Sequence, residues 1–129
     1  HVVRCGTVMT NLQTALASTT TFSEASMEAL LTKLEGVSLT AESLHLDQHS
    51  LIANTNLLEI LRTQAAVRMV TASLQSGLAR QESRGSFVRE DYPESSDDFL
   101  HHSKVDLNGK IGKLAIKKGA GGHWVLPPQ

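Results

Sequence analysis

Cysteine is nearly missing from this chain of 129 residues, which contains a single thiol, Cys5. One cysteine cannot form an internal disulfide or supply a paired-cysteine metal site, so a disulfide-stapled fold and a cysteine-based zinc site are excluded. This usage favours a reducing, cytoplasmic setting. The length suits one domain, which buries roughly two thirds of the surface of its unfolded chain.

Long apolar runs and an excess of charge of one sign are also lacking. No segment approaches the roughly eighteen consecutive apolar residues of a membrane-spanning helix, so direct insertion into a membrane is not expected. The formal net charge at neutral pH is -1. Such a balance provides no field that would attract nucleic acid or an anionic membrane surface, so neither is an expected partner.

Apolar residues at helical spacing predict three helices. The first covers 2–17 and ends at the hydroxyl-rich run 18–21, whose β-branched residues favour a turn. The second begins at Thr21, which has capping-box spacing to the glutamate three residues later, and ends near Gly36. Between 37 and 53 the pattern is irregular and predicts a loop with at most one helical turn.

The third predicted helix is the longest. It begins at Asn54 or Asn56, either of which can cap it, and runs to Arg84, so that Gly85 occupies the left-handed position beyond its end. Arg80 and Arg84 then place positive charge at the negative end of the helix dipole. Two apolar stripes on this helix predict that neighbouring helices pack against both. One stripe contains Leu58, Leu61, Ala65, Met69 and Ala72, and the other contains Val67, Val70, Leu74 and Leu78.

A small β-hairpin is expected near the C-terminus. The segments 104–107 and 110–116 flank Asn108-Gly109, a dipeptide that favours a type I′ turn. The predicted fold class is therefore mainly α, a three-helix bundle of the spectrin-repeat kind with a small C-terminal hairpin. The single domain 1–129 divides into a helical bundle over 2–85, a motif loop over 86–103, a hairpin over 104–117 and a flexible or extended tail over 118–129.

The most informative segment spans 80–103 and reads RQESRGSFVREDYPESSDDFLHHS. It resembles the signature Glu-Ser-Arg-Gly-x-x-x-Arg-x-Asp-x-Pro followed by Asp-Asp, found in the C-terminal helical domain of the fumarate reductase and succinate dehydrogenase flavoprotein family, which includes L-aspartate oxidase. The likeness extends upstream over 54–59 and weakens beyond 99–102. The matching residues of the signature are Glu82, Ser83, Arg84, Gly85, Arg89, Glu90, Asp91, Tyr92, Pro93, Asp97 and Asp98.

The resemblance implies a role for the chain within a larger enzyme. The chain is expected to be a fragment of an FAD-dependent oxidoreductase that passes hydride between flavin and the carbon–carbon bond of a dicarboxylate. By the same resemblance it carries no catalytic, cofactor-binding or metal-binding residue and is inactive alone. Its expected partners are the FAD-binding and capping domains and, in relatives that possess one, an iron–sulfur subunit. Other subunits would hold the cytoplasmic enzyme at the inner face of a membrane.

One departure from the family concerns position 87. The family has histidine there, whereas this chain has Phe87. Phenylalanine fills the same volume but neither donates nor accepts a hydrogen bond, so any role of the imidazole is lost. The departure leaves the substrate and the subfamily open.

Arg84 and Arg89 are the sharpest candidates for chemistry, because a guanidinium holds a carboxylate through a bidentate fork. The alternative is structural, since an arginine near a helix end and beside acidic residues pins the following loop through ion pairs. The resemblance favours the structural role, because the family's substrate-binding residues lie in the domains that precede this segment. The expected interface or motif residues are Glu82, Arg84, Gly85, Arg89, Asp91 and Pro93.

Four other groupings lack the spacing of a known site. They are the carboxylates Asp97 and Asp98, the histidines His45, His49, His101, His102 and His123, the hydroxyls Ser83 and Ser86, and the glycines 119–122. Adjacent side chains on a loop usually diverge, and the histidines lack the zinc-site pattern. The serines lack a nucleophile elbow, and the glycines lack the spacing of a phosphate-binding turn.

Lysines gather in and around the predicted hairpin, opposite in sign to the acidic stretch 82–98: Lys104, Lys110, Lys113, Lys117 and Lys118. Protection of an exposed sheet edge explains them, and complementary docking faces are the functional alternative. For the chain as a whole, the alternative hypothesis is a freestanding three-helix protein-interaction module without a redox role.

Overall fold

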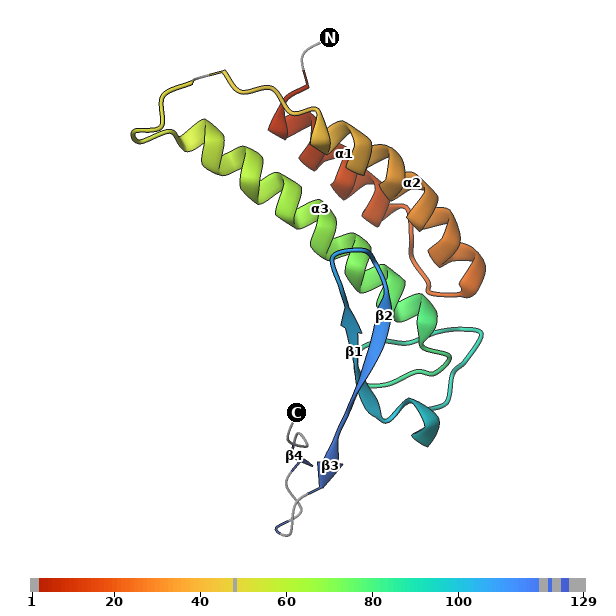
Figure 1. Cartoon of the computed structure of the whole chain (residues 1–129). Coiled ribbons are helices and arrows are strands. Elements are labelled where there is room, and N and C mark those ends of the chain that lie inside the picture. The colour runs from red at the N-terminus through yellow and green to blue at the C-terminus, as the bar shows by residue number, and fades with distance from the viewer. Residues whose placement is uncertain (1–2, 48, 119–120, 122–123, 126–129) are drawn as a thin grey trace.

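The computed structural model describes residues 3–47, 49–118, 121 and 124–125 (Figure 1). Three helices form a bundle, and a two-stranded antiparallel sheet follows them, so the predicted fold class is confirmed. The elements in chain order are α1 (Cys5–Ala17), α2 (Glu24–Glu42), α3 (Thr55–Ala79), the 3₁₀ turn η1 (Asp97–Phe99), β1 (His101–Val105), β2 (Ile111–Ala115), β3 (Lys117–Lys118) and β4 (Trp124–Val125).

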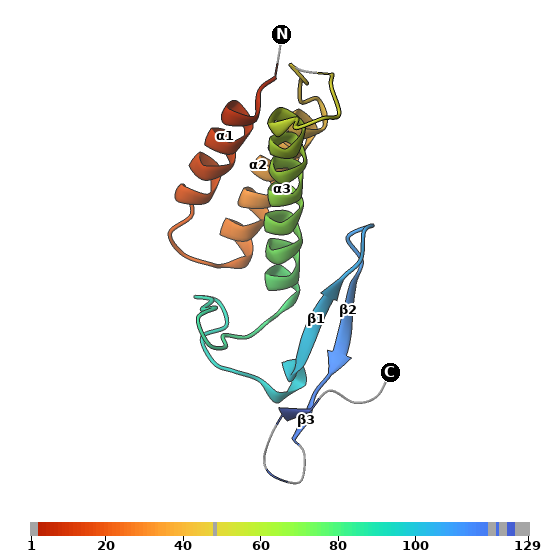
Figure 2. The ribbon, with the colours of Figure 1, turned by 90° about the vertical axis from the view of Figure 1, so that its left-hand side faces the viewer.

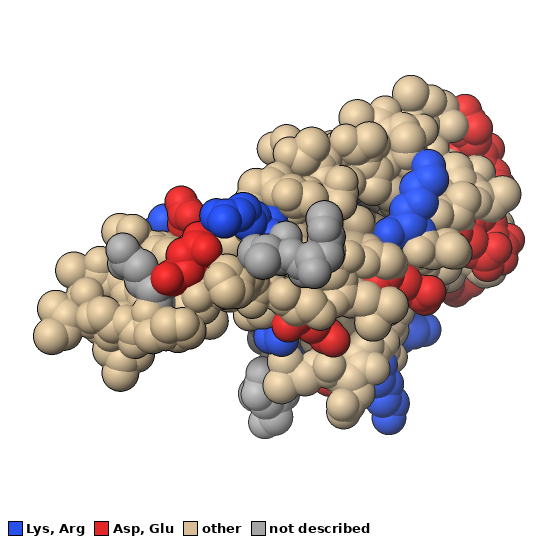
Figure 3. Space-filling model, turned by 90° about the horizontal axis from the view of Figure 1, so that it is seen from above, with Lys and Arg blue, Asp and Glu red and all other residues tan. Residues whose placement is uncertain are grey.

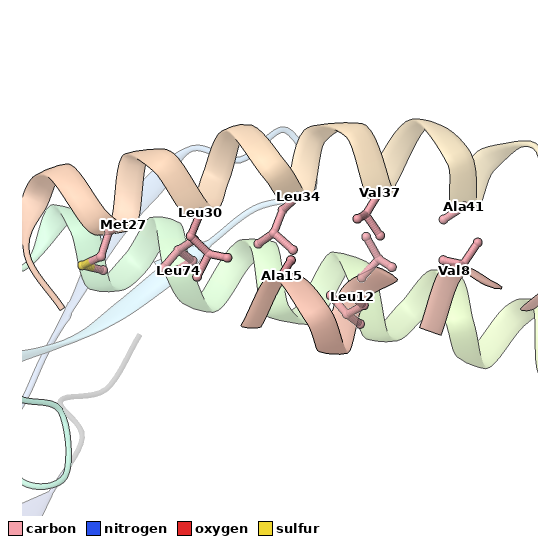
Figure 4. Packing of buried hydrophobic residues seen from close by; sticks show 10 residues of the cluster. Val8, Leu12, Ala15, Met27, Leu30, Leu34, Val37, Ala41 and Leu74 are labelled. Atoms are coloured by element: carbon pink, nitrogen blue, oxygen red, sulfur yellow. The ribbon is translucent and has the colours of Figure 1, made fainter. Parts of the chain in front are cut away.

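The core lies between the three helices, each of which packs against the other two. Figure 4 shows side chains of α1, α2 and α3 directed into the shared space. Burial of this apolar surface is the main source of the bundle's stability. The core cluster consists of Val8, Leu12, Ala15, Met27, Leu30, Leu34, Val37, Ala41, Val67 and Leu74.

Helix α2 differs from its prediction at both ends. Its N-cap is Ser23, not Thr21, and the capping box is completed by reciprocal bonds between Ser23 and Ser26. The helix does not end near Gly36, as predicted, but continues to Glu42. The glycine meets open space, and the buried residues Val37 and Ala41 extend the apolar stripe one turn further, so packing outweighs the weak helix propensity of glycine.

Helix α3 begins as predicted, because the side chain of Asn54 accepts a hydrogen bond from the N–H of Leu57 at 2.9 Å. It ends at Ala79, and the prediction that it runs to Arg84 is wrong. The expectation that both stripes are covered by helices is also wrong. The stripe through Leu74 faces the core, whereas the stripe through Leu58 and Met69 is largely exposed.

The hairpin of β1 and β2 lies beside the C-terminal half of α3, on the side away from α1 (Figure 2). Its register pairs Ser103 with Lys113. The turn is not type I′, because that turn needs positive φ at both central residues and here only Gly109, at 78°, has one. Asp106 closes the turn instead, since its carboxylate accepts bonds from the N–H groups of Asn108 and Lys110.

Beyond the hairpin, β3 pairs with β4 in an antiparallel manner. The rest of the predicted tail over 118–129 lies outside the described residues, apart from Gly121. No described helix has the length and apolar character required to cross a bilayer.

Candidate functional site: a charged loop that joins two helix ends

The signature segment of the sequence forms a loop over 80–96, between α3 and η1. Its first feature is a tight turn in which the backbones of Arg84 and Phe87 exchange hydrogen bonds of 2.9 and 3.1 Å. Gly85 lies in this turn with φ at +60°, a conformation that side-chain-bearing residues rarely adopt. The sequence therefore needs glycine here for a loop turn, not for a helix end.

Arg89 is the most deeply buried cation of the described residues, with 1% of its surface exposed. Its guanidinium forms a bidentate pair with Asp91, with distances of 2.9 Å from Nε and 2.5 Å from Nη2. The remaining nitrogen, Nη1, donates to the carbonyls of Leu78 at 3.0 Å and of Arg80 at 2.7 Å. A third acceptor is the carbonyl of Gly77, at 3.4 Å. These carbonyls belong to the last turn of α3, whose dipole favours a cation.

Asp91 links its partner Arg89 to a second helix, α2. Its Oδ2 accepts a hydrogen bond of 2.9 Å from the N–H of Glu24, the first residue of α2. A carboxylate at this position complements the positive end of the helix dipole. The backbone supports the link, because the N–H of Glu90 donates to the carbonyl of Phe22 at 2.8 Å. The Arg89–Asp91 pair therefore joins the C-terminus of α3 to the N-terminus of α2.

Glu82 is the centre of a second charged group. It is fully buried, and it lies between Arg80 and Arg84, with N–O distances of 2.9 and 3.0 Å. The N–H of Ser96 completes its set of donors at 2.9 Å. A buried carboxylate is tolerated only when it is paired and hydrogen-bonded, and each oxygen of Glu82 meets this condition.

Arg80 extends the Glu82 group to the hairpin. Its Nη1 donates to the carbonyl of His101 at 2.9 Å and to the hydroxyl of Ser103 at 3.0 Å. Its Nη2 also donates to the carbonyl of Phe99. One arginine at the end of α3 thus fixes the start of β1.

Ser83 holds the two arms of the loop together through hydrogen bonds. Ser83 is buried, its N–H donates to the carbonyl of Glu94 at 3.0 Å, and its hydroxyl donates to the carbonyl of Tyr92 at 2.6 Å. Pro93 is exposed between these two acceptors. Tyr92 places its ring 4.9 Å from the guanidinium carbon of Arg89, within the range of a cation–π contact. Ser83 is therefore a structural hydroxyl in this loop.

Phe87, at the position where the family carries histidine, is a packing residue. Its ring centroid lies 5.7 Å from that of Phe22. A methyl group placed on Gly77 would lie 3.1 Å from the Phe87 ring, which shows how closely the ring approaches α3. Phe87 also lines an apolar hollow of about 330 Å³ together with Leu16 and Met69. Phe87 therefore makes apolar contacts at the position where the resemblance leads one to expect a histidine.

The surroundings of the two carboxylates lower their pKa values. Burial alone would raise the pKa of Glu82, but hydrogen bonds from Arg84, the Ser96 N–H and Arg80 outweigh it and lower the pKa from 4.5 to about 2. The hydrogen bonds from Arg89, against a smaller effect of burial, lower the pKa of Asp91 from 3.8 to about 2. Both groups are therefore charged in the folded chain throughout the neutral range.

These shifts predict a loss of stability in acid. A carboxylate with a lowered pKa in the folded state stabilises that state fully above its unfolded pKa and loses the contribution as pH falls through the folded value. We expect the urea midpoint of unfolding to stay level from pH 7 to about 5 and to fall between about 4.5 and 2. A midpoint that stays level down to pH 2 would contradict the ionised pairs.

The turn at Gly85 gives a prediction about backbone conformation. Gly85→Ala is expected to lower the free energy of unfolding by about 1 to 2 kcal/mol, because alanine is strained at positive φ and nothing else lies within 4 Å of the new methyl group. Gly36→Ala, in the middle of α2, is the matched control and is expected to raise it by up to about 1 kcal/mol. Thermal unfolding of both variants checks the opposite signs.

The described residues do not assemble a site from the other candidate groups. Within the described residues, no three His, Cys, Asp or Glu side chains lie close enough to hold a metal ion. Asp97 and Asp98 are exposed in η1, and His101 and His102 point to opposite faces of β1. The side chains of the lysines on the described hairpin strands and turn are exposed, whereas those of Lys117 and Lys118 are not described.

Sequence reasoning missed the roles of Arg80, Ser83 and Ser96. A signal was present, because Arg80, Glu82 and Arg84 alternate in charge at a spacing of two. Residues two apart do not face each other on a helix but share a face in extended chain. This spacing indicates that the helix has already ended before the signature begins.

The bundle and this loop define a class of protein module: a helical domain whose C-terminal loop ties the helix ends to a small sheet by buried ion pairs. The sequence model of the family described as "Fumarate reductase flavoprotein C-term" matches residues 10–120. The chain belongs to this family, and it is a flavoprotein C-terminal domain of the succinate dehydrogenase and fumarate reductase type.

Similar proteins agree with this assignment. The succinate dehydrogenase flavoprotein subunit of Rickettsia felis is 37% identical over 73 residues, which cover 54% of this chain and 12% of that protein. The fumarate reductase flavoprotein subunit of Mycobacterium tuberculosis is 39% identical over 76 residues, which cover 55% of this chain and 13% of that protein. The chain thus spans about one eighth of the length of these curated relatives.

A solved structure also resembles the chain. It is the FrdA subunit of Escherichia coli quinol fumarate reductase with a single substitution, and it matches with a TM-score of 0.65 at 25% identity. The match covers 82% of this chain and 18% of that one. The resemblance inferred from the signature is confirmed by all three comparisons.

Proposed function

We propose that the chain serves as a structural and docking domain of an FAD-dependent oxidoreductase and does not catalyse the reaction itself. The observation that carries this proposal is the engagement of both signature arginines within the chain. Arg89 is buried and bonded to Asp91 and to helix carbonyls, and Arg84 is paired with Glu82 through Nε and Nη2. In both arginines Nε and Nη2, which form the bidentate fork, already donate to a carboxylate of the chain. This fork is therefore not available to a substrate carboxylate.

The activity proposed for the whole protein follows from the family. The parent polypeptide binds FAD in a domain other than this one and transfers hydride between the flavin and the carbon–carbon bond of a dicarboxylate. The sequence of this chain lacks the G-x-G-x-x-G spacing of a dinucleotide-binding turn. Its single domain would contribute a rigid bundle, the signature loop and the hairpin.

The proposed partners are the FAD-binding and capping domains of the same polypeptide. The signature residues Glu82, Arg84, Gly85, Arg89, Asp91 and Pro93 would shape the loop that meets them. Lysines exposed on the hairpin, Lys104, Lys110 and Lys113, would offer a basic surface to an iron–sulfur subunit. Through such subunits the enzyme would lie at the inner face of a membrane, on the cytoplasmic side.

The natural polypeptide provides the test. An antibody raised against this chain is expected to capture a protein several times longer than 129 residues, with the visible absorption of bound flavin and fumarate or succinate turnover. The isolated chain, at equal concentration, is expected to bind no FAD in equilibrium dialysis. Capture of a colourless protein of about the size of this chain would support a freestanding interaction module instead.

A further inference from the structure

Helix α3 presents an apolar stripe to solvent between Leu58 and Met69. Leu58 and Leu61 are 52% and 54% exposed, and Met69 is 67% exposed. Ala65 is exposed between them. The spacing of these four residues is that of one helix face, which we call the outer face of α3. A row of large exposed apolar residues on one face is a mark of an interaction site, whereas single exposed residues are not.

The rest of the chain covers only part of this side of α3. The core-facing residues Ile60, Val67 and Leu74 pack on the other side of the helix. The hairpin turn reaches the far end of the outer face, where the residues 105–109 line a hollow with Arg68, Met69 and Ala72. Gly109 approaches the side chain of Gln75 there. The described residues leave the outer face open from Leu58 to Ala65, and Met69, although 67% exposed, borders this hollow.

Two arginines flank the outer face. At 3.6 residues per turn, Arg62 falls about 60° to one side of the stripe and Arg68 about 60° to the other. Among the described residues, the remaining four arginines pair with carboxylates, whereas Arg62 and Arg68 form no ion pair. The acidic residue of the helix, Glu59, lies further round towards α1, where it and Arg62 line a hollow with Cys5.

We propose that the outer face of α3 binds an amphipathic helix that carries Asp and Glu on both sides of its apolar ridge. The apolar ridge would cover the leucines and Met69, and the acidic flanks would meet Arg62 and Arg68. The inference deepens the docking role proposed above and rests on it, because it names the chemistry of the partner surface that the domain meets.

The dimensions of the outer face suit a helix of about three turns. The eleven-residue interval from Leu58 to Met69 spans about 17 Å of α3. Ala65, at its centre, allows a partner backbone to approach closely, as small residues do where helices cross. The apolar hollow of about 330 Å³ adjoins Met69, whose flexible side chain adapts to an inserted apolar residue.

The surface continues beyond the start of α3. In the loop that precedes it, Leu51 and Ile52 are each 86% exposed. In Figure 3 the tip of the projecting end, at the left of the view, is uncharged, and acidic and basic side chains lie at its base. The loop residues 49–54 include no Asp or Glu, so acidic flanks of a partner meet no like charge from this loop.

A pair of synthetic peptides tests the proposal on the 129-residue chain. Both are 18-residue helices with leucine at the ridge positions, and one has glutamate and the other lysine at the flanking positions. Fluorescence anisotropy is expected to show at least tenfold tighter binding of the glutamate peptide. The double substitution Arg62→Glu with Arg68→Glu is expected to reverse the preference. Equal affinity of the two peptides would overturn the proposal.

Substitutions within the stripe supply the second readout. Met69→Asp is expected to weaken binding of the glutamate peptide at least tenfold, and Leu39→Asp, at a residue of similar exposure on α2, is expected to leave it unchanged. Ala65→Arg is a second test if Met69→Asp alters the helical circular dichroism. Binding that survives both Met69→Asp and Ala65→Arg would overturn the proposal.

Two other occupants are distinguishable from the acidic helix. Sedimentation velocity that shows a dimer, converted to a monomer by Met69→Asp, would replace the proposal with self-association. Binding to phosphatidylglycerol vesicles that is lost in the same variant would replace it with a lipid surface. Failure of the docking role itself is a separate result, because it appears in the mass and flavin content of the natural polypeptide and not in peptide affinity.

Discussion

Arg89→Ala is expected to lower the free energy of unfolding by about 3 to 5 kcal/mol. The substitution leaves the carboxylate of Asp91 without its cation and removes the donor from the last carbonyls of α3. Small domains are stable by about 5 to 15 kcal/mol, so the loss is a large part of the total. Urea unfolding followed by circular dichroism at pH 7 measures it.

The shape of the side chain matters as much as its charge. Arg89→Lys keeps a cation but loses the planar fork that reaches two carboxylate oxygens and the helix carbonyls together, so we expect it to recover little of the stability. Arg68→Ala, at an exposed arginine without an ion pair among the described residues, is the matched control and is expected to change stability by less than about 0.5 kcal/mol. Equal effects of Arg89→Ala and Arg68→Ala would refute the role of the buried fork.

The second large effect is expected at Glu82. Glu82→Ala removes the acceptor shared by Arg80 and Arg84 and leaves their charges without a buried partner, which we expect to cost about 3 to 5 kcal/mol. Glu82→Gln keeps the volume and one acceptor oxygen, so its cost is expected to be smaller, about 1 to 3 kcal/mol. Urea unfolding at pH 7 ranks the two variants.

The pH dependence of Glu82→Gln separates the charge from the shape. The variant cannot ionise at this position, so its urea midpoint should fall less steeply than that of the parent chain between about pH 4.5 and 2. The remaining slope would come largely from Asp91, whose pKa is also lowered to about 2. Identical slopes in the two proteins would assign the acid sensitivity to other groups.

Much of the fold was predictable from the sequence, because helical spacing of apolar residues reports burial directly. Met27, Leu30 and Leu34 lie at helical spacing in the sequence and form part of the face that α2 buries, and Asn54 predicted the start of α3. Gly36 does not act as a stop signal, because α2 continues through it to Glu42. Its cost in a helix is about 1 kcal/mol, which the burial of Val37 and Ala41 exceeds.

The interior of the site was not predictable in the same way. Nothing in the local sequence says that the guanidinium of Arg89 reaches the carbonyls of α3, because the contact spans nine to twelve residues and depends on how the loop folds back. The bond from the N–H of Glu24 to Asp91 spans 67 residues. Such contacts follow from tertiary structure, whereas the ion pairs at a spacing of two were visible in the sequence.

Asp91 accepts a hydrogen bond from the first turn of α2, and Arg89 donates to the last carbonyls of α3. Opening of the domain therefore involves both helix ends at once. Neither helix end can fray while the loop stays folded, and the loop cannot detach without exposing both ends. Amide protons at the start of α2 and at the end of α3 should therefore exchange with deuterium at a common rate, as one cooperative unit.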